Sequence, residues 1–179
     1  YIYTECYKYH KYGKPLIEPL YHKYPMLYDD ELYSNEYFFG SNILVSPILN
    51  KKDSIMNRVI HKVYIPDGVW YGISTGKKYN GGKRYVSFYK DDQYPLFVKA
   101  GSIIPMSLNN YNDTGIPNKL EIAVYPGANN TYSIYEDDGV AKKTRNVING
   151  SVTLKPIKNL QIVGRVSYDV SHSSSDSYT

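Results

Sequence analysis

The sequence is poor in cysteine, tryptophan and long apolar runs. Cys6 is its only cysteine, which excludes an internal disulfide framework. No run of 18 apolar residues occurs, so we predict no transmembrane helix and expect no membrane partner. At 179 residues the chain is long enough to bury a core without a disulfide or a metal.

The chain also has little excess of positive over negative charge. The formal net charge is only +4, and basic residues alternate with acidic ones, as where Lys51 and Lys52 precede Asp53. A nucleic-acid-binding domain concentrates Lys and Arg on one face or stripe. We therefore expect no nucleic-acid partner.

Residue patterns that hold metals or cofactors are missing. The four histidines, His10, His22, His61 and His172, do not pair with each other or with Cys6 at zinc spacing. No glycine-rich phosphate loop and no Gly-x-Ser-x-Gly run occurs, so we expect no metal, no cofactor and no serine nucleophile of that kind. The aspartate doublets are adjacent in sequence and are best interpreted as solvated turns: Asp29-Asp30, Asp91-Asp92 and Asp137-Asp138.

Tyrosine is abundant, with 22 residues against 4 phenylalanines. Tyrosine suits a half-buried strand, where its ring packs and its hydroxyl reaches water or a partner. This abundance favours β structure and identifies no function.

The first part of the chain predicts a helix followed by an edge strand. Apolar spacing at Ile2, Cys6 and Tyr9 predicts a helix over residues 2–12, with Gly13 as its stop. Residues 16–21 form a short apolar run that contains Pro19, which favours an edge, terminal or bulged strand. Residues 24–36 are polar and predict a surface connection that has room for one helical turn.

From Gly40 onward the apolar pattern changes to period two. Strands are predicted over 43–47, 58–65, 69–71, 84–89, 96–99 and 102–105, with a turn at 66–68 and a hairpin at 79–83. Residues 109–118 predict a linker, and a second hairpin system follows it, with weaker strands at 152–154, 160–163 and 166–168. Short strands at this spacing are typical of an antiparallel β-sandwich or barrel.

One aromatic pair is a candidate binding feature. Trp70 and Tyr71 follow a Pro-Asp-Gly turn and could form a stacking platform for a sugar. The alternative is that Trp70 is a core anchor, because large aromatic side chains bury the most area per residue. Both interpretations stay open at this point.

Read in order, five segments resemble the C-terminal portion of glycoside hydrolase family 31, the α-glucosidase and α-xylosidase family. The first is KPLIEPL at 14–20, and the second is FFGSNILVSP at 38–47. The third is VYIPDGVWY at 63–71 with TG at 75–76, and the fourth is PLFVKAGSIIP at 95–105. The fifth combines VYPG at 124–127 with YEDDG at 135–139. Each segment alone is unspecific, and their shared order and spacing carry the resemblance.

The resemblance implies a domain organisation. In such enzymes a (β/α)₈ barrel is followed by two β-sandwiches, so residues 1–38 are expected to be the C-terminal end of the barrel, a short helix and strand. Residues 39–110 resemble the proximal C-terminal sandwich, and residues 118–170 resemble the start of the distal one. Residues 171–179 are Ser-rich and are expected to be a disordered tail.

The resemblance also implies an activity that this chain would not perform alone. The family hydrolyses α-glycosides with retention, using two aspartates, one as nucleophile and one as general acid/base. Their motifs lie upstream of the matched segments, and no Trp-x-Asp-Met-Asn-Glu type run occurs, so no catalytic residue is assigned. Glu18 stands where many relatives have Arg, at the end of the strand that resembles the last barrel strand, and is a candidate for the substrate rim or for a local ion pair.

We therefore predict a non-catalytic C-terminal portion of a retaining, α-glucosidase-like enzyme. Its expected partners are an upstream catalytic barrel of the same polypeptide and, for the whole enzyme, an α-linked oligosaccharide. The exposed barrel remnant is a candidate surface for self-association. The alternative is a carbohydrate-binding or structural β-sandwich module without enzymatic activity.

Overall fold

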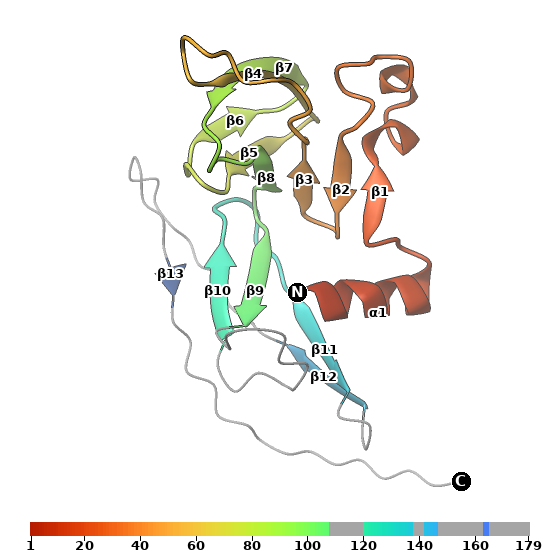
Figure 1. Cartoon of the computed structure of the whole chain (residues 1–179). Helices are drawn as coiled ribbons and strands as arrows, with labels where there is room; N and C mark the ends of the chain where they lie inside the picture. Colours follow the sequence, from red (N-terminus) through yellow and green to blue (C-terminus); the bar gives the residue numbers. More distant parts are fainter. Residues whose placement is uncertain (108–119, 138–141, 147–162, 165–179) are drawn as a thin grey trace, which may run out of the picture.

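A computed structural model describes residues 1–107, 120–137, 142–146 and 163–164 (Figure 1). Its strands pair antiparallel throughout, and one α-helix precedes them. The expected class, a mainly β antiparallel sandwich preceded by a short helix and strand, is confirmed. Within the described part of the chain, no helix is long and apolar enough to cross a membrane.

The largest sheet has six strands in the order β1-β2-β3-β8-β5-β6. Short apolar segments form most of it, as expected for a sheet that is covered on both faces, because Leu44 and Phe97 lie in one buried cluster and Ile43 and Val98 in another. Its strands are β1 (Ile17–Pro19), β2 (Tyr37–Phe39), β3 (Ile43–Val45), β8 (Leu96–Lys99), β5 (Val69–Gly72) and β6 (Lys78–Asn80).

A two-stranded sheet of β4 (Val59–Ile65) and β7 (Lys83–Tyr89) contributes to the same core. Along β4 the residues alternate, with Val59, His61, Val63 and Ile65 buried, which confirms the period-two prediction. The main core combines β4 with the six-stranded sheet and two 3₁₀ turns at Leu20–His22 and Pro25–Leu27. Its buried residues are Leu20, Leu27, Tyr33, Phe38, Leu44, Val63, Ile65, Trp70, Tyr79 and Phe97.

The hairpin predicted at 79–83 is wrong. β6 pairs with β5, whereas β7 pairs with β4, so the chain crosses between two sheets at this point. Gly81 N–H donates to the carbonyl of Gly68 at 2.6 Å, and Gly82 N–H donates to that of Ile65 at 2.8 Å. The double glycine therefore lies backbone to backbone against the 65–68 turn. A close approach of this kind favours Gly for the same reason that a tight hairpin does, so the sequence signal was ambiguous.

Further strands lie below the main core in Figure 1. β9 (Ile103–Ser107), β10 (Leu120–Val124) and β13 (Val163–Gly164) form one sheet, and β11 (Ser133–Asp137) pairs with β12 (Lys142–Asn146). The pairing of β9 with β10 joins strands from both sides of the predicted linker. The linker at 109–118, most of the weaker strands after 150 and the tail at 171–179 lie outside the described residues, and the division into domains stays a prediction.

Helix α1 (Ile2–Tyr12) ends as predicted, because Gly13 adopts the left-handed conformation with φ 67°. The helix lies against β11, where the Tyr7 and Tyr135 rings stack with centroids 3.6 Å apart. Tyr135 N–H also donates to Thr4 Oγ1 at 3.1 Å. Part of residues 1–38 thus packs on the β structure that follows, through these contacts of α1 with β11.

Candidate functional site

Glu18 lies on β1, the edge strand of the six-stranded sheet. Its Oε2 is 2.8 Å from Lys23 Nζ, and the carboxylate is partly exposed. The Lys23 ammonium also stands over the Phe38 ring, 4.7 Å from its centroid. In this structure Glu18 thus has a local ion-pair partner, and its role at a substrate rim stays a prediction.

Trp70 lies inside the main core. Its side chain is 3% exposed, its ring stacks on Phe38, and its Nε1–H donates to the carbonyl of Pro66 at 2.8 Å. Neither face of the indole is open to a sugar ring in this structure. The core-anchor interpretation of Trp70 describes its placement.

Tyr71 is next to Trp70 on β5, so its side chain points to the opposite face of the sheet. It is half-buried, and its ring lies 6.1 Å from that of Tyr125 at an angle of 38°. The structure therefore separates the two members of the predicted platform. A sugar contact by Tyr71 alone stays a prediction.

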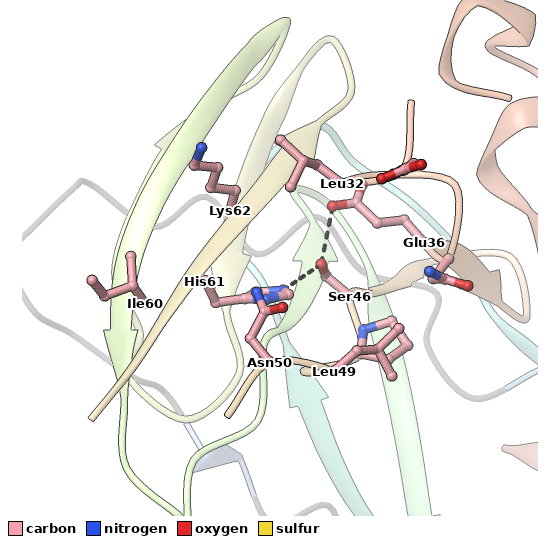
Figure 2. Close-up of a pocket in the computed structure, with 11 residues that line it drawn as sticks. Leu32, Glu36, Ser46, Leu49, Asn50, Ile60, His61 and Lys62 are labelled. Carbon is pink, nitrogen blue, oxygen red and sulfur yellow. Dashed lines mark hydrogen bonds between the residues drawn. The ribbon is translucent and has the colours of Figure 1, made fainter. Parts of the chain in front are cut away.

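A buried polar cluster that sequence analysis missed lies elsewhere, around Glu36, Ser46 and His61 (Figure 2). Ser46 Oγ is 3.0 Å from Glu36 Oε1 and 2.8 Å from His61 Nε2. Tyr64 N–H donates to the same Glu36 oxygen at 2.9 Å. A signal was present only for His61, which occupies a buried position in the alternation of β4, whereas nothing in the sequence singled out Glu36.

The three side chains come from three elements. Glu36 immediately precedes β2, Ser46 immediately follows β3, and His61 is on β4. Burial lowers the pKa of His61, and the contact with Ser46 acts in the opposite direction. Burial raises the pKa of Glu36 to about 8, against the hydrogen bonds from Tyr64 and Ser46, which lower it.

This order of contacts is not that of a nucleophilic triad. A triad needs the imidazole between the carboxylate and the hydroxyl, so that the histidine removes the hydroxyl proton. Here Ser46 is in the middle and is itself 1% exposed, although the cluster borders a cavity of about 200 Å³. The arrangement can hold and exchange protons, but it presents no nucleophile to a substrate.

Groups of three or more His, Cys, Asp or Glu side chains that could hold a metal ion do not occur among the described residues. Cys6 is exposed on α1 and unbridged. The described side chains thus give no observation that calls for a metal or a cofactor.

Comparison with known proteins identifies the chain's relatives. The family model "Glycosyl hydrolase family 31 C-terminal domain" matches residues 13–104. An α-xylosidase of Saccharolobus solfataricus is 30% identical over 145 residues, which are 78% of this chain and 19% of that protein. A probable alpha/beta-glucosidase of Aspergillus fumigatus is 29% identical over 176 residues, 94% of this chain and 19% of that protein.

Solved structures also resemble this chain. The cycloalternan-forming enzyme from Listeria monocytogenes, solved in complex with a pentasaccharide substrate, matches with a TM-score of 0.66 and 30% identity. The match covers 80% of this chain and 14% of that one. This chain therefore spans about a fifth or less of the length of these relatives. The chain belongs to glycoside hydrolase family 31, and residues 13–104 are its match to the family's C-terminal domain.

Proposed function

We propose that this chain is a non-catalytic C-terminal portion of a retaining α-glycosidase, which as a whole hydrolyses terminal α-linked glucosyl residues. The match of residues 13–104 to the family's C-terminal domain is the observation that carries the proposal. The relatives include an α-xylosidase and a probable alpha/beta-glucosidase, and more than four-fifths of each of these proteins lies outside the aligned part. The two aspartates of the retaining mechanism would lie in that remaining part.

The proposed role of this chain is to cover and support the upstream catalytic barrel. Apolar side chains on α1 and β1 support this role, because they are more than half exposed although they belong to ordered elements: Ile2, Tyr3, Tyr9, Tyr12 and Ile17. Large apolar side chains that ordered elements leave exposed are candidates for an interface. In the absence of the barrel, the same side chains would favour self-association of the purified chain.

An activity assay tests the first part of the proposal. The purified chain is incubated with p-nitrophenyl α-glucoside and α-xyloside, and we expect no release of p-nitrophenol above the buffer blank. The Saccharolobus solfataricus α-xylosidase, assayed in parallel on the xyloside, is the positive control. Release by this chain that scales with its concentration and survives further purification would show that it carries its own catalytic groups.

A further inference from the structure

Glu36 joins three parts of the fold through one residue. Its backbone carbonyl accepts a hydrogen bond from Leu20 N–H at 2.8 Å. Its side-chain Oε1 accepts from Tyr64 N–H on β4 and from Ser46 Oγ beyond β3. Because Tyr64 N–H points toward Glu36, it points away from β7, and the carboxyl group caps the open edge of β4 at this residue.

The second oxygen of this carboxyl group, Glu36 Oε2, is buried and has no hydrogen-bond partner among the described residues. The side chain as a whole is 2% exposed. An ionised carboxylate that is buried without a cation is strongly disfavoured. A proton on Glu36 removes that charge.

Among the residues that the structure describes, no cation is paired with Glu36. Asp30, on its own segment, lies close enough to disfavour its ionisation further, and Arg84 on β7 is 3.4 Å from Asp30. Lys23 beyond the 3₁₀ turn at Leu20–His22 is paired with Glu18. The other titratable groups around the cluster and its cavity include Glu31 and Tyr33 on the same segment and His61, Lys62 and Tyr64 on β4. The ring of Tyr89 on β7 contacts that of His61, and the ring of Tyr24 contacts that of Tyr64.

We propose that Glu36, Ser46 and His61 form a proton-operated latch, which holds residues 30–36 against β4 while the Glu36 carboxyl is protonated and releases them when it ionises. The cavity beside the cluster gives the ionised group a route to water, because it is open at a rim that includes the exposed side chains of Leu32, Leu49 and Ile60 (Figure 2). Release exposes Tyr64 N–H, which is otherwise covered by Glu36.

The direction of the pH dependence follows from the folded-state pKa. The pKa of Glu36 is raised from its ordinary value of 4.5 to about 8, so the folded form binds this proton more tightly than an opened form. The stabilisation is complete below the ordinary pKa and is lost as the pH rises toward and through 8. Between these two values, each further pH unit multiplies the population of the opened form about tenfold relative to the closed one. His61 has its pKa lowered and stays neutral over the upper part of this range, so it does not reverse the trend.

Amide hydrogen exchange on the full chain tests the latch. The protection factor of Tyr64 N–H, corrected for the intrinsic pH dependence of exchange, is measured between pH 6 and pH 9.5. We expect it to fall by up to about tenfold per pH unit as the pH approaches 8, and then to level off once Glu36 is ionised in both forms. The amide of Val63 points toward β7 by strand alternation, and its protection is expected to change little over the same range.

Two variants separate the latch from a general loss of stability. Glu36→Gln keeps a carbonyl oxygen for both donors but cannot ionise, so Tyr64 protection is expected to be independent of pH. Glu31→Gln alters an exposed carboxyl on the same segment and should retain the wild-type pH dependence. The proposal is overturned if wild-type Tyr64 protection is flat up to pH 9.5, if Tyr64 and Val63 fall in parallel, or if Glu36→Gln falls like the wild type. The comparison of Tyr64 with Val63 needs no variant, so it decides the question even where Glu36→Gln fails to fold.

Discussion

Replacing Gly81 with alanine is expected to lower the free energy of unfolding by about 3 kcal/mol or more, the upper end for steric overpacking. A Cβ atom added at Gly81 would lie 1.7 Å from the carbonyl oxygen of Pro66 and 2.9 Å from that of Gly68. Both neighbours are backbone atoms, so neither can rotate away. The Pro66 carbonyl is also the acceptor for Trp70 Nε1–H, so a shift of this turn disturbs the main core.

Urea unfolding followed by Trp70 fluorescence measures this effect directly, because Trp70 is the only tryptophan and is buried. Gly76→Ala is the matched control. Gly76 has φ +63° but open space where its Cβ would lie, so it reports backbone strain alone, about 1 kcal/mol. Equal losses in the two variants would mean that the 81–82 crossing does not pack against the 65–68 turn as described.

Replacing Glu5 with alanine is expected to cost about 3 kcal/mol, the range for breaking a buried charged pair. Glu5 on α1 is 3% exposed. Its Oε1 accepts from Tyr132 OH at 2.8 Å and contacts Lys8 Nζ at 2.5 Å, and its Oε2 accepts from Ser41 Oγ at 2.8 Å. Alanine would leave all three donors without this acceptor.

The readout for Glu5→Ala is urea unfolding together with hydrogen exchange of the α1 amides. An isolated helix of 11 residues is marginal in water, so a helix that leaves β11 should lose its amide protection. Glu31→Ala removes an exposed carboxylate and should change stability by less than about 0.5 kcal/mol. Unchanged α1 protection in Glu5→Ala would show that ring stacking, and not this carboxylate, holds the helix.

Local patterns in the sequence predicted local structure well. The helix over residues 2–12 with its stop at Gly13, and the alternation along 59–65, both follow from contacts within a few residues. The partner of each strand does not, because pairing depends on residues far away in the chain. For this reason the glycines at 81–82 were interpreted as a hairpin, whereas they carry the chain between two sheets.

The residues of the candidate site were equally hard to predict, because their burial depends on residues far away in the chain. Trp70 stood out because it is a rare residue, and it proved to be buried. Glu36 looked like one of many polar residues in a surface connection, yet it is buried with an unpartnered oxygen. No local pattern distinguishes the two cases, since burial of Glu36 depends on Ser46 and Tyr64, which are 10 and 28 residues away.

The size and activity of the natural protein test the central claim most directly. An antibody raised against this chain is used to isolate the protein from the cells that express it, and its mass and its hydrolysis of p-nitrophenyl α-glucoside and α-xyloside are measured. Because this chain covers about a fifth or less of its relatives, we predict a polypeptide several times heavier than 20.6 kDa with α-glycosidase activity. A natural protein of 20.6 kDa, or a larger one without activity on either α-glycoside, would contradict the account.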